Sequence, residues 1–222
     1  MERPYVILSA AVSLDGFLDD DSPERLVLSN EADFDRVDAV RAGVDAIAVG
    51  AGTVRADDPR LQVRSETRRA ERTAAGLRAT PLRVVFSPSG ELDPQARLFT
   101  SGDPVVVYTS AAGAAACPVG PAAAEVVATA EREVDLEAAL ADLAARGVER
   151  LLVEGGGTVH TAFLSADLAD EVHVAVAPFL LGERGGARFV YPASFPQSPA
   201  RPLRLVETRA IGAIALLVYR RA

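Results

Sequence analysis

Two glycine-rich stretches, each following an apolar run, carry the polar residues of this chain that are best placed for chemistry. In the first, residues 151–153 are apolar and are followed by Glu154, by three glycines at 155–157 and by Thr158. This pattern is typical of a buried strand, a tight turn and the first turn of a helix. Free backbone N–H groups and the positive end of a helix attract phosphate at such a junction. We therefore predict that it binds an anionic cofactor, with Glu154 at the rim.

The same three glycines also have a structural explanation, because a glycine-rich turn lets a helix pack close to a sheet. The dinucleotide fingerprint G-x-G-x-x-G is not matched, since His160 occupies the position of its third glycine. From the residues alone, both explanations of the turn stay open.

The second stretch begins at Gly50, directly after an apolar run at 45–49, and continues through Gly52 and Thr53. It then contains the carboxylates Asp57 and Asp58 and three arginines, at positions 55, 60 and 64. A guanidinium group binds two phosphate oxygens at once, and a hydroxyl with backbone amides completes such a cradle. The alternatives are structural: Asp58 caps a backbone N–H, and the arginines are solvated loop residues.

The composition excludes several classes of function. All 23 basic residues are arginine, so mechanisms that use a lysine are excluded. The net charge of −8 argues against a partner that is nucleic acid or an acidic membrane. One cysteine, Cys117, and two histidines, His160 and His173, do not form a zinc motif, so we expect no metal. With 49% hydrophobic residues, no membrane-length apolar run and no signal-like start, we expect a cytoplasmic protein.

The apolar runs predict a series of alternating strands and helices. The predicted strands cover residues 4–12, 45–49, 82–86, 104–108, 125–128, 151–153 and 170–177. A helix capped by Asn30 or Ser29 is predicted to reach Ala42, and a second, with Leu136, Leu140 and Leu143 on one face, to end at Gly147. Residues 13–16 are a predicted turn, and residues 20–23 a polar loop. Residues 65–80 are either a mobile excursion or a short exposed helix, and no function is assigned to them.

Near the C-terminus the pattern changes from alternating strands and helices to paired strands. Residues 203–208 and 214–219 are predicted to form a hairpin around Gly212, which adds an antiparallel edge to the sheet. His173 is interpreted as a partly exposed strand residue, because Val172, Val174 and Val176 take the alternate positions. The predicted fold is a single α/β domain over residues 1–222, with three α/β/α layers and a mixed, mostly parallel sheet.

Four segments together carry a resemblance that covers nearly the whole chain, at residues 13–16, 41–47, 52–61 and 153–157. In their order and spacing they resemble the riboflavin-biosynthesis reductase family, the RibD C-terminal or pyrimidine reductase domain with a dihydrofolate-reductase-like fold. The resemblance implies an NADPH-dependent enzyme. Its substrate would be a ribosylaminopyrimidine 5′-phosphate, whose ribosyl group opens and accepts a hydride at C1′ to become ribityl.

The resemblance also implies roles for individual residues. The residues that would contact NADPH are Thr53, Asp57, Ser87, Gly155, Gly156, Gly157, Thr158 and Val159. Those that would contact the substrate are Arg41, Leu61, Arg64 and Glu154. Asp57 is the candidate for moving the proton that a reduction to a secondary amine requires. Both glycine turns would adjoin one sheet edge, so that one dinucleotide bridges them. A homodimer built partly on the terminal hairpin is also implied.

The chain departs from the family in three respects. Bifunctional members carry a zinc deaminase domain, and the zinc-binding motifs of that domain do not occur in this sequence. We therefore expect a stand-alone reductase. Residues 25–28 lack the aromatic residue that many members have, and residues 87–89 read Ser-Pro-Ser where many have an Asp-Ser pair. Two other functions therefore stay open: a reductase of a pterin or another small molecule, and a catalytically silent nucleotide-binding or dimerisation module.

Overall fold

The computed structural model describes residues 3–20, 22, 26–182 and 185–222. The predicted loop at 20–23 and the departure at 25–28 therefore lie partly outside the described residues. The chain divides into two compact units. The first comprises Met1–Tyr5 and Asp38–Leu152, and the second comprises Val6–Val37 and Val153–Ala222. The prediction of one domain over residues 1–222 stays a prediction.

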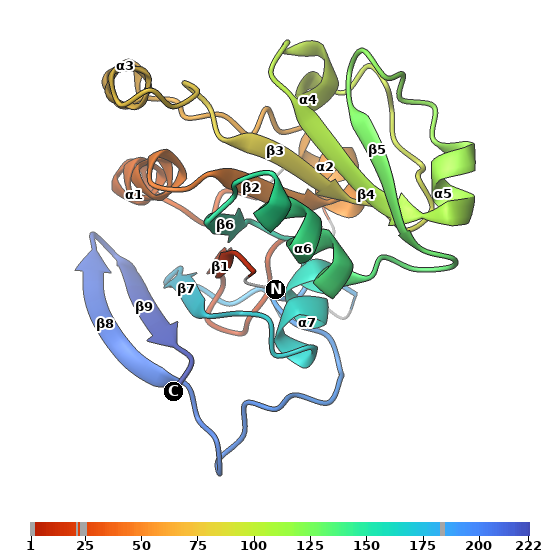
Figure 1. Cartoon of the computed structure of the whole chain (residues 1–222). Helices are drawn as coiled ribbons and strands as arrows, with labels where there is room; N and C mark the ends of the chain where they lie inside the picture. The colour runs from red at the N-terminus through yellow and green to blue at the C-terminus, as the bar shows by residue number, and fades with distance from the viewer. Residues whose placement is uncertain (1–2, 21, 23–25, 183–184) are drawn as a thin grey trace. The chain divides into compact units, whose positions relative to one another are not determined.

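The first unit is built mainly on parallel strands. Their order is β5-β4-β3-β2-β6, and the pairs β2/β3, β3/β4 and β4/β5 are parallel (Figure 1). Every residue of β2 and β4 is buried, as expected of parallel strands that are covered on both faces. The strands are β2 Ala46–Gly50, β3 Leu82–Phe86, β4 Val105–Ser110, β5 Glu125–Ala130 and β6 Arg150–Val153. The helices are α2 Ala51–Asp57, α3 Glu66–Ala74, α4 Arg97–Thr100, α5 Ala111–Ala116 and α6 Leu136–Ala145.

The second unit contains the strands β1 Tyr5–Val12, β7 Glu171–Val176, β9 Ile214–Arg220 and β8 Arg204–Ile211, in the order β1-β7-β9-β8. β1 and β7 are parallel, whereas β9 is antiparallel to both β7 and β8. Gly212, with φ +62°, forms the turn of this hairpin. The unit also contains α7 Gly157–Ser165 and the first part of α1 Glu31–Ala42. The predicted α/β fold, with its mostly parallel sheet and terminal hairpin, is confirmed.

The capping predictions are confirmed at two helix ends. The Asn30 side chain accepts a 2.9 Å hydrogen bond from the backbone N–H of Asp33, so it caps α1 as predicted. Gly147, with φ +83°, follows the end of α6. Of the two alternatives for residues 65–80, the structure contains the helix, α3. One of its residues is buried: Arg72 donates to the carbonyl oxygens of Ala42, Val44 and Arg78.

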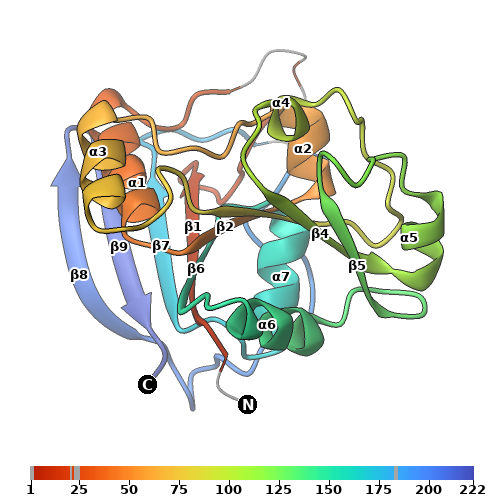
Figure 2. The ribbon, with the colours of Figure 1, turned by 45° about the horizontal axis from the view of Figure 1, so that its top comes forward.

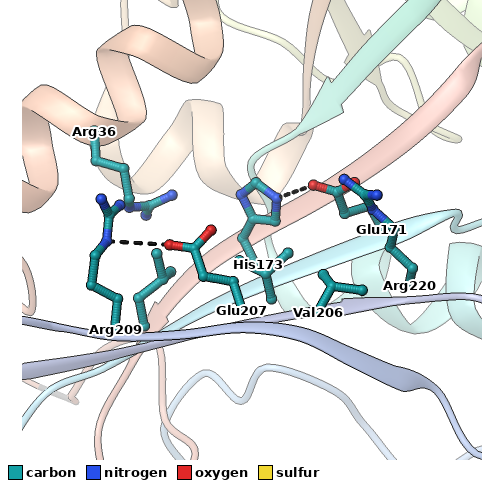
Figure 3. Close-up of a pocket in the computed structure, with 9 residues that line it drawn as sticks. Arg36, Glu171, His173, Val206, Glu207, Arg209 and Arg220 are labelled. Atoms are coloured by element: carbon teal, nitrogen blue, oxygen red, sulfur yellow. Dashed lines mark hydrogen bonds and ion pairs between the residues drawn. The ribbon is translucent and has the colours of Figure 1, made fainter.

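The prediction that His173 is partly exposed is wrong. His173 is 8% exposed, and its Nε2 atom is hydrogen-bonded to the Glu171 carboxylate. It lines a cavity of about 270 Å³ between α1 and the strands β7, β9 and β8 (Figure 3). The valine alternation on β7 pointed to the wrong face, because Val174 is only half-buried. Polar groups occupy the buried face because charge pairing satisfies them, as in the 2.8 Å pair of Arg220 with Glu171.

Candidate active site

In the first unit, the second glycine-rich stretch forms the junction between β2 and α2. β2 ends at Gly50, whose extended backbone (φ −82°, ψ 157°) starts α2 without a side-chain cap. Thr53 lies in the first turn of α2, and Asp57 is its last residue. Residues four apart share one face of a helix. The structure therefore places the two predicted NADPH contacts, Thr53 and Asp57, on one face of α2, and both are half-buried.

Ser87 lies at the same sheet edge as this junction. Gly50 pairs with Phe86 in the β2/β3 register, so Ser87 follows β3 where α2 begins. Its side chain is fully buried, and among the described residues its hydroxyl has no hydrogen-bond partner. Arg55 ties α2 to the loop after Ser87 through a 3.1 Å hydrogen bond from Nη1 to the Glu91 carbonyl oxygen.

The three predicted substrate contacts of the first unit come together around residues 58–65. Leu61 adopts a left-handed backbone conformation (φ 48°) and its side chain is 2% exposed. Arg41 donates from Nη1 to the carbonyl oxygen of Gln62 at 3.0 Å, and Arg64 follows two residues later. Asp58 Oδ1 accepts a 2.7 Å hydrogen bond from the N–H of Arg97, which confirms the capping role predicted for it.

Arg83 is a supporting residue that the sequence analysis missed. Its side chain is fully buried on β3. Burial lowers the pKa of its guanidinium group, and the negative charge of Asp103 only partly offsets this. Its Nη1 donates to the carbonyl oxygen of Leu98 at 2.7 Å, and to Arg60 at 3.4 Å. It also contacts the Asp103 carbonyl oxygen and the Ser101 hydroxyl. An arginine inside an otherwise apolar strand is the signal that could have revealed it.

In the second unit, the three glycines form the turn between Val153 and α7. Gly155 has φ +121°, and the Gly155–Gly156 peptide bond is cis. Gly156 is the N-cap of α7 and accepts backbone hydrogen bonds from Val159 and His160. α7 has no side-chain cap at this end, and the first N–H groups of a helix point out of its N-terminus. Such a terminus is suited to an anion, and the binding of an anionic cofactor there stays a prediction.

Gly157 has a packing role in addition. A Cβ atom at this position would lie 1.9 Å from the Arg188 carbonyl oxygen and 3.0 Å from Tyr191 Cε2. The N–H of Tyr191 donates to Thr161 Oγ1 at 2.9 Å, so residues 188–191 lie directly on α7. The structural explanation of the glycines therefore holds for Gly157, where a backbone segment, rather than a sheet, makes the close approach. Glu154 at the rim is half-buried.

Residues 13–16 are predicted as a turn and carry part of the family resemblance, but the role of Asp15 within them was not predicted. This carboxylate accepts hydrogen bonds from the Ser13 hydroxyl at 2.6 Å and from the N–H groups of Leu181 and Gly182. The Ser13 hydroxyl, followed by the two backbone N–H groups, lowers the pKa of Asp15 to about 2. Asp15 thereby fixes the loop that follows β7, and the Ser-x-Asp-Gly pattern was the available signal.

His160 lies on α7, and its role in the structure was not predicted from the sequence. It is fully buried, with its ring centroid 5.1 Å from that of Phe189. Burial lowers the pKa of His160 to about 4, and the backbone of Val153 and Phe189 only partly opposes this. At neutral pH the ring is therefore an uncharged packing group beneath residues 188–191, and it is not an acid or a base for catalysis.

Acidification is expected to destabilise the protein through His160. The unfolded histidine binds a proton near pH 6.5, but the buried one does so only near pH 4, so stability falls across this window and levels off below it. The loss reaches about 3 kcal/mol at most. Urea unfolding at pH 7.0 and 4.5 would measure it. A His160→Gln variant should lose about 2 kcal/mol less between these two pH values, because pH 4.5 is still above the pKa of the buried ring. Equal losses in both proteins would contradict the assignment.

The fold and the two glycine turns are those expected of a pyrimidine reductase domain. The family model of the RibD C-terminal domain matches residues 4–217. The chain belongs to this family. It is 40% identical over 183 residues to the 2,5-diamino-6-ribosylamino-4(3H)-pyrimidinone 5′-phosphate reductase of Archaeoglobus fulgidus, covering 82% of this chain and 84% of that one. The enzyme of the same name from Methanothermobacter thermautotrophicus is 38% identical, covering 85% and 84%.

Solved structures show the same fold. The Thermotoga maritima diaminohydroxyphosphoribosylaminopyrimidine deaminase/reductase superposes with a TM-score of 0.80 at 27% identity, covering 99% of this chain. This chain spans 57% of the length of that protein. The Saccharomyces cerevisiae riboflavin biosynthesis reductase has a TM-score of 0.71 at 20% identity and covers 99% of this chain, which supports the fold alone.

No helix within the described ranges is long and apolar enough to span a membrane.

Proposed function

We propose that this protein is an NADPH-dependent reductase that converts the ribosyl group of a ribosylaminopyrimidine 5′-phosphate to ribityl. The observation that carries the proposal is the similarity to a relative named as a reductase of this substrate. The two chains are 40% identical over 183 residues, which cover 84% of the relative. Membership of the reductase family supports a nicotinamide cofactor. NADPH rather than NADH is proposed because Arg55 and Arg60 provide guanidinium groups for a 2′-phosphate.

The cofactor contacts proposed in the first unit are Thr53, Asp57 and Ser87, and in the second unit residues 155–159. Two observations support them. Thr53 and Asp57 share one face of α2, and Ser87 follows the neighbouring strand. The uncapped N-terminus of α7 presents backbone N–H groups at Gly157 and Thr158, which suit a pyrophosphate.

The substrate contacts proposed are Arg41, Leu61 and Arg64 in the first unit and Glu154 in the second. Bound NADPH would supply a hydride to C1′ of the opened ribosyl group. The electron pair of the C=N bond then moves to the nitrogen, which takes up one proton. Asp57 is proposed to relay that proton. Arg64 binds the substrate phosphate, and the remaining contribution of the protein is positioning.

We further propose that the protein is a cytoplasmic homodimer built partly on the terminal hairpin. Leu205 on β8 is 48% exposed and lies opposite the half-buried Tyr219 on β9. An exposed apolar side chain such as Leu205 on the edge strand β8 belongs to a surface that a second copy would cover. Figure 2 shows β8 at the end of the β7-β9-β8 strands.

The function is tested by mixing the purified protein with NADPH and a panel of acceptors. Loss of NADPH absorbance is expected with the ribosylaminopyrimidine 5′-phosphate and not with dihydrofolate, and NADH is expected to be the poorer donor. Turnover of a pterin instead would favour the alternative reductase. Binding of NADPH without reduction of any acceptor would overturn the enzymatic proposal.

Light scattering of the same sample is expected to give twice the mass of the chain.

A further inference from the structure

Arginines from two helices hold the carbonyl groups of residues 62–64, which we call the clamped segment. Arg41 on α1 donates to the carbonyl oxygen of Gln62 at 3.0 Å. Arg69 on α3 donates from Nη1 to the carbonyl oxygens of Val63 at 3.0 Å and of Arg64 at 2.8 Å. Three successive carbonyl groups are thus bound by side chains, although this segment belongs to no helix or strand.

A single carboxylate holds the other side of the same backbone. Asp38 Oδ1 accepts the N–H of Arg64, and Asp38 Oδ2 accepts the N–H of Ser65 at 3.0 Å. The Oδ2 atom also accepts a 3.0 Å hydrogen bond from Nη1 of Arg68. Asp38 and Arg41 lie one turn apart on α1, so one helix contacts both the N–H and the carbonyl groups of the clamped segment. Figure 2 shows α3 beside α1, and Arg68 and Arg72 bond across that contact.

Asp38 is ionised in this environment although it is only 3% exposed. Burial raises the pKa of its carboxyl group, but the N–H groups of Arg64 and Ser65 and the charge of Arg68 more than offset this, so the pKa lies below its usual value. A buried carboxylate that accepts three hydrogen bonds from charged or peptide donors holds its partners firmly. The backbone of Arg64 is therefore set before any ligand arrives.

We propose that Asp38 is a positioning residue that aims Arg64 at the phosphate group of the substrate. This inference rests on the proposed function, because it takes Arg64 as the phosphate contact. A guanidinium group binds phosphate by a planar, two-point geometry, so a small rotation of the Arg64 backbone would misalign it. Asp38 does not touch the substrate. It lowers the cost of binding by removing the freedom that Arg64 would otherwise lose.

An Asp38→Asn variant tests the inference, because it keeps the size of the side chain and removes the charge. The probe is ribose 5-phosphate, with ribose as the ligand that lacks the phosphate, and binding is measured by calorimetry. The variant is expected to bind ribose 5-phosphate about tenfold to a hundredfold more weakly, the loss typical of one or two charge-assisted hydrogen bonds. Its affinities for ribose and for NADPH are expected to stay within about twofold.

The Arg64→Met background separates positioning from a general structural role. If Asp38 acts through Arg64, the Asp38→Asn substitution has no further effect on ribose 5-phosphate binding when Arg64 is already Met. An effect of the same size in that background, an equal loss of NADPH affinity, or no binding of ribose 5-phosphate to the wild type would each overturn the inference. Asp35→Asn, an exposed position on the same helix, serves as the matched control.

Two further measurements complete the test. If circular dichroism shows that Asp38→Asn is unfolded, Asp38→Glu replaces it, because the longer side chain keeps the charge but shifts Arg64 and should give the same selective loss. Failure of the proposed function looks different: the wild type would then reduce no pyrimidine acceptor. The ribose 5-phosphate affinities would still decide the role of Asp38.

Discussion

Replacing Gly157 with alanine is expected to lower kcat/KM for NADPH by about a hundredfold or more, the cost typical of a misplacement of about 1 Å in a binding site. The added Cβ atom would lie 1.9 Å from the Arg188 carbonyl oxygen, which is backbone and cannot rotate away. Either α7 or residues 188–191 must move. The latter are held by the bond from Tyr191 to Thr161 and by the N–H of Phe189, which donates to the Gly16 carbonyl oxygen at 3.0 Å.

Movement of α7 would displace the backbone N–H groups that we propose for the pyrophosphate. Overpacking alone costs about 1–3 kcal/mol, so the variant is expected to fold with a lower melting temperature. The measurements are steady-state kinetics with varied NADPH and a thermal melt. Gly120→Ala is the matched control, because its Cβ atom would meet nothing within 4 Å and its φ is not positive. Unchanged NADPH kinetics in a folded Gly157→Ala protein would refute the phosphate role of this turn.

Replacing Asp57 with asparagine is expected to lower kcat by about a hundredfold or more at saturating NADPH and substrate, because general acid–base catalysis typically contributes ~10²–10⁴-fold. The amide keeps the shape of the carboxyl group but cannot relay a proton to the nitrogen of the reduced bond. Asp57 is also a proposed cofactor contact, so the affinity for NADPH should be measured separately by fluorescence titration. The loss of kcat at saturation isolates the proton step from binding.

Asp58→Asn is the control for the neighbouring position. Asp58 caps the N–H of Arg97, and asparagine caps nearly as well, so stability and kcat are both expected to stay close to those of the wild type. Retention of kcat in Asp57→Asn would show that the proton comes from water instead. The reduction would then depend on positioning alone, and the reductase assignment would stand without a catalytic acid.

Local features of the fold could be predicted because their causes are local in sequence. The apolar run at 82–86 is strand β3, and Asn30 caps α1 through a residue three positions away. Gly212 turns the hairpin because a glycine accepts a positive φ without strain. The family, too, was recognisable from the order and spacing of the four segments, and the match over residues 4–217 confirms it.

The tertiary structure alone decided the contacts that join distant residues. Asp15 bonds to the N–H of Gly182, 167 positions later, and Asp38 bonds to Arg64, 26 positions later. Neither pairing leaves a periodic signal, because hydrophobic periodicity reports which face of an element is buried and not which polar group it meets.

His173 is a residue for which hydrophobic periodicity gave a wrong prediction. Its alternation with valines predicted exposure, but α1 and the hairpin enclose its face of β7, and the bond to Glu171 makes a buried imidazole acceptable. The residue types along this chain therefore determined its elements and its family. Only the tertiary structure decided which backbone groups Asp38 binds and which segment packs against Gly157, because both contacts join residues that are far apart in the sequence.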